Sequence, residues 1–315
     1  MRSREFTRYN VDTWNAQSLR REEKQQELVE YMLRNGVDVC ALQETWLEGS
    51  SVKQIERTGH VFVLENEEGC KRRGVGIALS REATDAWDAA GRKKWVSECS
   101  RLLAVRLKFE DDQGKKVSLV VMTGYRPLAS DQVAQERFDE SVMSMFDSFA
   151  NEDVVVFGAD INGSVGVEFE DTVWKFGIHR VNNSGRAFRE TMLALDCVSP
   201  TSYKDPGPWG KPLKEKKHRW RLSVRNSCKG GGRTTARKFK RAMMAKEMTL
   251  LRSSGLSNTL DRFWERMRAN RFASWTHPGR EQSLHQLDHW WVKKADLRRV
   301  CNATVLPECL GRTTA

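Results

Sequence analysis

Residues 152–163 read EDVVVFGADING, and the order of residue types in this stretch decides the fold. The apolar run VVVF predicts a buried strand, and Asp160 and Asn162 follow at the point where that strand should end. Polar groups placed directly after a buried strand are typical of sites at one edge of a layered α/β protein. The stretch therefore predicts an α/β protein whose chemistry lies at a sheet edge.

Two other segments repeat this pattern. Residues 13–19 read TWNAQSL and supply Asn15, and residues 40–46 read CALQETW and supply Glu44. A further apolar segment, QLDHWW, carries Asp288 within it. Because strand ends converge on one edge, we expect these side chains to form one site. Carboxylate and amide oxygens without His or Cys suit Mg²⁺, or alternatively Mn²⁺, better than zinc.

The surrounding sequence predicts helices mixed with strands. A hairpin is expected where EDDQG joins two apolar runs at 101–109 and 115–125. Apolar residues at helical spacing predict helices, and QLDHWWV is expected to be the last strand. The predicted helices cover residues 20–36 (closed by Gly36), 131–149, 184–196 and 238–255. Together they indicate an α/β sandwich forming a single domain over residues 1–315.

Positive charge is concentrated in one part of the chain. The net charge is +11, and residues 201–241 hold fourteen Lys and Arg against two Asp and Glu. Residues 198–240 show no sustained period and are predicted to be a basic insertion or flexible loop. Such a segment favours polyanions, with a solvated loop or nuclear-import signal as the alternatives. The predicted nucleic-acid contacts are Arg126, Lys216, Lys217, Arg219, Arg237, Lys238 and Trp275, and Trp209 and Trp220 either stack on bases or pack on the body.

Several protein classes are disfavoured by composition. The seven cysteines are scattered and form no CxxC motif, which disfavours a zinc ribbon or a disulfide framework. No apolar run approaches the length of a membrane span, and no signal peptide or anchor is recognisable. We therefore expect an intracellular protein without a membrane partner, located in the nucleus.

Six ordered motifs carry a resemblance to a known family. TWNAQSL, LQETW, TGYRP, GADIN, SWTHP and HQLDH resemble the endonuclease/exonuclease/phosphatase superfamily. More narrowly, they are similar to the apurinic-type endonuclease domain of non-LTR (LINE-type) retrotransposons. The resemblance implies a four-layered, DNase I-like α/β sandwich and Mg²⁺-dependent nicking of duplex DNA, with RNA as a second candidate partner. It also implies a following reverse transcriptase domain, which this sequence does not contain.

The resemblance assigns roles to the strand-end residues. Glu44 would be the metal ligand, with Asn15 beside it. Asp160 would orient and deprotonate the attacking water, and Asn162 would hold the phosphate. A metal and preplaced donors stabilise a charged transition state, which agrees with these roles.

Two further positions and several departures complete the comparison with the family. Tyr125 would meet the negative charge developing on the phosphoryl oxygens, and Asp288 would hold a catalytic histidine or lie near the metal. Gln17 stands where repair-type relatives carry an acid, and Leu128 stands where an amide is common.

Histidine is the main departure. The family closes its site with an Asp-His pair after the final strand, and none of the six histidines occupies that place. Asp288 and His289 do not replace the pair, because consecutive strand residues face opposite ways. We therefore expect a domain cut short before the pair and weakened as an enzyme. The alternatives are an inactive relative that binds nucleic acid, and another phosphatase of the superfamily.

Overall fold

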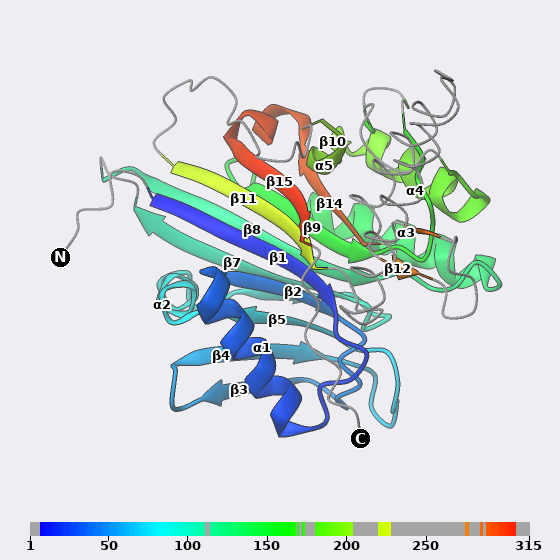
Figure 1. The fold of residues 1–315 in the computed structure, drawn as a ribbon. Coiled ribbons are helices and arrows are strands. Elements are labelled where there is room, and N and C mark those ends of the chain that lie inside the picture. The colour runs from blue at the N-terminus through cyan, green and yellow to red at the C-terminus, as the bar shows by residue number, and fades with distance from the viewer. Residues whose placement is uncertain are drawn as a thin grey trace, which may run out of the picture.

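Two β-sheets stacked face to face form the centre of the molecule in the computed structural model (Figure 1). The structure describes residues 7–110, 114–167, 169, 172–173, 180–203, 220–227, 275–276, 284–285 and 288–306. The first sheet has seven strands, in the order β15 (Val300–Leu306), β11 (Trp220–Ser227), β1 (Thr7–Asn15), β2 (Val39–Gln43), β5 (Val75–Leu79), β4 (His60–Glu65) and β3 (Ser51–Ile55).

The second sheet has six strands. Their order is β10 (Cys197–Val198), β14 (Asp288–Lys293), β9 (Val154–Asp160), β8 (Lys116–Tyr125), β7 (Leu102–Glu110) and β6 (Lys94–Val96). Strands β12 (Trp275–Thr276) and β13 (Leu284–His285) form a separate two-stranded ladder. The helices are α1 (Glu22–Asn35), α2 (Arg81–Ala89), α3 (Gln132–Asp147), α4 (Asn183–Ala194), α5 (Pro200–Tyr203) and the 3-10 helix η1 (Lys294–Arg299).

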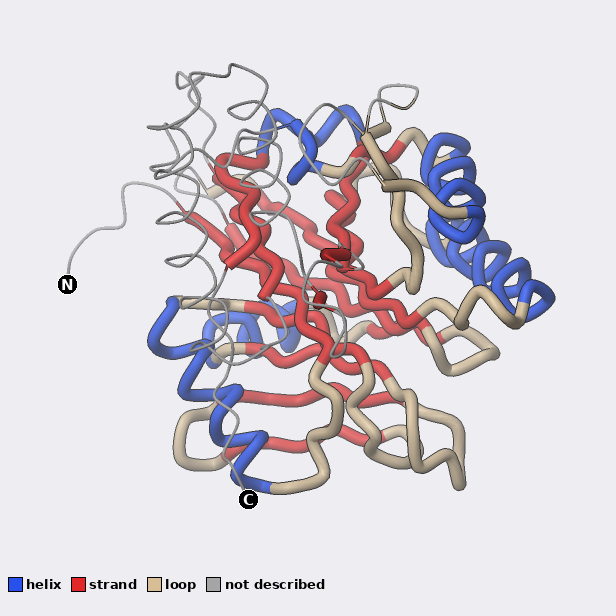
Figure 2. The backbone as a smooth tube through the Cα atoms, turned by 45° about the vertical axis from the view of Figure 1, so that its right-hand side comes forward, coloured by secondary structure: helices blue, strands red, loops and turns tan. Residues whose placement is uncertain are grey.

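Three apolar clusters hold the layers together, and alternation along the strands explains them. In β9, Val156 belongs to the cluster between the two sheets, whereas Val155 and Phe157 pack with residues of α3 and α4. A third cluster joins α1 to the outer face of the first sheet. Figure 2 shows the same layers of helix and strand from a second side. The predicted four-layered α/β sandwich is confirmed.

Several predicted elements are present with nearly the predicted bounds. The hairpin is β7 and β8, paired antiparallel. Helix α1 ends at Asn35, and Gly36 follows in the left-handed conformation with φ of 59°. Glycine adopts this conformation without the steric cost of a Cβ, which is why it closes the helix.

Two predictions about the C-terminal third are wrong. The segment 198–240 is not wholly irregular, because β11 lies within it and pairs in parallel with both β1 and β15. The strand QLDHWWV is not the last one either, since β15 follows it. The helix predicted at 238–255 lies outside the described residues. None of the described helices is long and apolar enough to cross a membrane.

Strand direction brings the predicted site residues to one edge. Strands β1 and β2 are parallel, with Asn15 opposite Gln43. Asn15 and Glu44, the residue after Gln43, therefore lie at the same end of the first sheet. In the second sheet, Asp160 of β9 has Tyr125 of β8 and Asp288 of β14 as its backbone partners.

Candidate active site

One amide joins the two carboxylates at the sheet edge. The Asn15 Nδ2 atom donates to Glu44 Oε1 at 2.6 Å and to Asp160 Oδ2 at 2.6 Å. Asn15 and Asp160 are buried, and Glu44 is half-buried. The predicted convergence of these three residues is therefore present, and the contact spans the two sheets.

The amide has a clear electrostatic function in this arrangement. Two carboxylates that approach each other repel, and a buried carboxylate needs a donor or a cation. The two N–H groups of Asn15 supply one donor to each carboxylate. Its Oδ1 accepts the backbone N–H of Gln17 at 3.3 Å, which orients the amide.

The backbone turns sharply at two of the site residues. Glu44 has φ of 51° and Asn162 has φ of 47°, a region that non-glycine residues rarely adopt. The loop holding Glu44 is fixed by the backbone N–H of Ser18, which donates to Glu44 O at 2.8 Å. Backbone strain of this kind is common at functional sites, where it aims a side chain.

Tyr125 lies beside the carboxylates as a protonated phenol. Burial, and then the charges of Glu44 and Asp160, raise the pKa of Tyr125 well above its ordinary value. The Asn162 side chain and the Arg101 guanidinium, which lies 5.7 Å from the ring centroid, partly offset this rise in the pKa. A phenol that keeps its proton can donate a hydrogen bond to an oxygen that gains negative charge.

The donor set fits a hard divalent cation. Glu44 and Asp160 offer carboxylate oxygens, and the amide oxygen of Asn15 also accepts the backbone N–H of Gln17. Within the described part of the chain, no group of three or more His, Cys, Asp or Glu residues could hold a metal. Mg²⁺ needs no such group, since it is usually held by one or two carboxylates and keeps several waters. The residues at this edge therefore fit Mg²⁺ or Mn²⁺.

A polar network behind the site was not predicted from the sequence. Gln43 is fully buried, and its Nε2 donates to Thr13 Oγ1 and Thr123 Oγ1, each at 3.0 Å. The Thr123 hydroxyl in turn donates to Leu42 O at 3.0 Å. These bonds join β2 to its neighbour β1 in the first sheet and to β8 in the second sheet, directly below the carboxylates. The available signal was Gln43 itself, a polar residue at the end of the apolar run CAL.

The prediction that Arg126 contacts nucleic acid is wrong. Arg126 is 1% exposed, and its guanidinium donates to both carboxylate oxygens of Asp139, at 2.8 and 2.5 Å. It also donates to the carbonyl and hydroxyl of Ser184. Arg126 therefore forms a buried ion pair with Asp139 of α3 rather than the expected contact at the surface.

The other predicted residues are only partly described. Asp288 is placed by register opposite Asp160, and Trp275 lies in β12 opposite His285. His289 is buried, with its ring centroid 6.1 Å from that of Trp291. Lys216, Lys217, Arg219, Arg237 and Lys238 lie outside the described residues, and so does Trp209. Trp220 is the first residue of β11.

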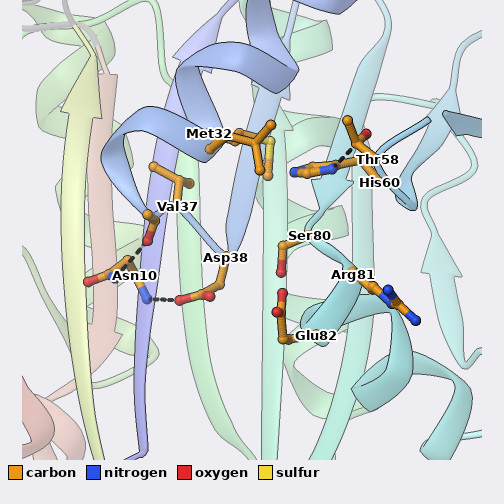
Figure 3. A pocket seen from close by; sticks show the side chains of 11 residues that line it. Asn10, Met32, Val37, Asp38, Thr58, His60, Ser80, Arg81 and Glu82 are labelled. Carbon is orange, nitrogen blue, oxygen red and sulfur yellow. Dashed lines mark hydrogen bonds between the residues drawn. The ribbon is translucent and has the colours of Figure 1, made fainter. Parts of the chain in front are cut away.

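A cavity of about 550 Å³ lies at the other end of the first sheet (Figure 3). Its lining includes Asn10, which lies in β1 five residues before Asn15, and Asp38, which directly precedes β2. The Asn10 N–H donates to Asp38 Oδ2 at 2.7 Å, and His60 is held by Thr58. The cavity is therefore separate from the predicted site.

Part of the chain matches a known protein family. Residues 13–115 match the model of the Endonuclease/Exonuclease/phosphatase family. No curated protein matches the chain significantly. Among solved structures, the APE2 catalytic domain from Xenopus laevis is 10% identical, with a TM-score of 0.50, over 91% of this chain and 83% of that one.

Two further solved structures are similar over the same share of this chain. An AP endonuclease from Archaeoglobus fulgidus is 13% identical over 91% of this chain and 87% of that one, with a TM-score of 0.48. The 3' phosphatase NExo from Neisseria, bound to a product DNA hairpin, has the same identity and coverage, with a TM-score of 0.49. Residues 13–115 are therefore similar to the Endonuclease/Exonuclease/phosphatase family, and the likeness to the APE2 catalytic domain is one of fold.

Proposed function

We propose that this protein is a Mg²⁺-dependent endonuclease that nicks one strand of duplex DNA, as in LINE-type retrotransposons. The observation that carries the proposal is the pair of 2.6 Å contacts from Asn15 Nδ2 to Glu44 and Asp160, with Tyr125 alongside. We propose the retrotransposon branch of the superfamily because the six motifs from TWNAQSL to HQLDH resemble that branch. A reverse transcriptase acting on the nicked strand would be the natural partner, and nuclear DNA the natural target.

Each residue has a defined part in the proposed reaction. Glu44 and Asn15 would hold Mg²⁺, which supplies positive charge against the phosphoryl oxygens. Asp160 would accept the proton of the attacking water, because it is a buried carboxylate and a carboxylate can act as a general base. The phenol of Tyr125 and the amide of Asn162 would donate to the phosphate oxygens as charge builds up on them.

Nicking of supercoiled plasmid tests the proposal. We expect open-circular product with Mg²⁺ and none with EDTA. Glu44→Ala and Asp160→Ala should each lower the rate about 100-fold or more, since each removes a charge at the reacting centre. Glu48→Ala is the matched control, because Glu48 is an exposed acid four residues beyond Glu44.

The same assay separates the alternatives. Nicking that survives both substitutions would show that the site is elsewhere. Plasmid that is retarded in a gel but never cut, in either Mg²⁺ or Mn²⁺, would favour an inactive protein that binds nucleic acid.

A further inference from the structure

Arg126 connects three residues of the proposed site to two helices. Its backbone N–H donates to Asp160 O at 2.9 Å. Its backbone carbonyl accepts the Asn162 Nδ2 proton at 2.6 Å. It directly follows Tyr125 in the chain, so Tyr125, Asp160 and Asn162 all depend on where this one peptide lies.

The side chain of Arg126 fixes that peptide from behind. Its Nε and Nη2 atoms bind both oxygens of Asp139 on α3, and its Nη1 atom binds the carbonyl and hydroxyl of Ser184 on α4. A guanidinium held bidentately by a carboxylate has little rotational freedom. The Phe188 ring, 5.5 Å from the guanidinium carbon, closes the remaining face.

A second bridge supports the same loop. Gln135 of α3 donates to Pro127 O at 2.8 Å and to Ser184 Oγ at 2.9 Å. The strand end that carries Tyr125 is therefore joined to both helices through side chains that are buried or nearly so.

We propose that the Arg126–Asp139 ion pair is a positioning device for the active site, which sets the orientation of the Asn162 amide and the Tyr125 phenol. The inference rests on the proposed function, because it assigns those two groups to the phosphate. Arg126 and Asp139 touch no reacting atom and act only through the peptide between Tyr125 and Pro127. Small misplacements of such groups cost about 100-fold in rate.

The chain contains a matched control for this ion pair. Arg106 Nη2 lies 2.6 Å from Asp153 Oδ2, and the Asp153 side chain is 1% exposed. Asp153 precedes β9, whereas Asp160 ends it, so this second pair is at the far end of the same strand. Asp139→Asn and Asp153→Asn each remove one charge from a buried pair, and both should lower stability.

The test compares steady-state nicking by these two variants. We expect Asp139→Asn to lower kcat about tenfold or more with KM little changed, and Asp153→Asn to change neither, since only the first pair contacts the site loop. Equal effects on kcat from the two variants would overturn the inference.

A double variant keeps the test valid if Asp139→Asn folds poorly. Arg126→Met with Asp139→Leu replaces the pair by apolar side chains, a change that often leaves stability unaltered or raises it. We expect a stable protein whose kcat remains low. A stable double variant with wild-type kcat would contradict the proposal.

A measurement on the Asn162 side chain needs no activity. Its amide protons can be assigned in an NMR spectrum by their loss in Asn162→Asp. We expect them to be protected from solvent exchange in the wild type and in Asp153→Asn, and to exchange faster in Asp139→Asn. If the Asn162 amide protons exchanged at the same rate in Asp139→Asn as in the wild type, the positioning role of the ion pair would be refuted. A wild type that never cuts DNA would refute the proposed function alone, since the exchange comparison would still decide about the ion pair.

Discussion

The Asn15 amide nitrogen lies 2.6 Å from Asp160 Oδ2, although the two residues are 145 positions apart and belong to different sheets. The same nitrogen lies 2.6 Å from Glu44 Oε1. A neutral donor thus separates two acids in a largely buried site. This arrangement makes the identity of residue 15 critical for the charge balance of the site and, under the proposed function, for metal binding.

Asn15→Asp should convert the bridge into a third carboxylate. In EDTA we expect a loss of about 1–3 kcal/mol in the free energy of unfolding, because two hydrogen bonds are replaced by like-charge repulsion. Mg²⁺ or Mn²⁺ should restore much of the loss by neutralising the cluster. Urea unfolding with and without metal measures both effects.

The control for this variant is Asn151→Asp, which adds the same charge at an exposed turn. It should change stability little in either condition. If Asn15→Asp were as stable as Asn151→Asp in EDTA, the amide would not be bridging the two acids.

Tyr125→Phe should lower kcat about tenfold to 100-fold without weakening DNA binding to the same degree. The phenol makes its hydrogen bond to charge that exists mainly in the transition state, so its loss appears in kcat. Single-turnover and steady-state nicking separate the effect on kcat from the effect on DNA binding. An unchanged kcat would remove Tyr125 from the mechanism.

The raised pKa of Tyr125 also predicts a pH dependence of stability. Burial and the neighbouring acids favour the neutral phenol in the folded state. Above the ordinary tyrosine pKa of about 10, the unfolded chain therefore releases this proton more readily than the folded one, and stability falls as pH rises. The contribution is fully present below that pH. Unfolding measured from pH 9 upward should show a shallower decline in Tyr125→Phe, and identical slopes would contradict the assignment.

Much of this fold could be predicted because its signals are local. The run VVVF before Asp160 and the polar ends after Asn15 and Glu44 are readable in short windows. Strand ends in layered folds share an edge, so the convergence of these residues could also be predicted. Their hydrogen bonds could not, since those depend on how two sheets stack.

Other features were missed for identifiable physical reasons. Strand β11 alternates apolar and polar residues in WRLSVR, but it lies in a segment whose charge indicates a solvated loop. Arg126 looks like a phosphate ligand in sequence, because its partners Asp139 and Ser184 are 13 and 58 residues away. Nothing local shows that α3 and α4 pack over it.

Val224→Pro tests the placement of β11. Val224 pairs with Val11 of β1 on one side and Ala303 of β15 on the other. Proline there removes a ladder N–H between two strands and should cost about 3 kcal/mol or more, or prevent folding.

The matched control for that placement is Val52→Pro in β3, which is an edge strand among the described residues and pairs there only with β4. Edge strands tolerate proline better. Equal stability of the two variants, measured by thermal unfolding, would contradict the placement of β11 between β1 and β15.

The most direct test of the central claim, that Glu44 is a metal ligand at the sheet edge, is a Mn²⁺ titration followed by electron paramagnetic resonance. We expect the wild type and Glu48→Gln to bind Mn²⁺ with the same affinity. Glu44→Gln, which keeps the shape and removes the charge, should weaken binding about tenfold or more. Equal Mn²⁺ affinity in Glu44→Gln and the wild type would contradict the assignment.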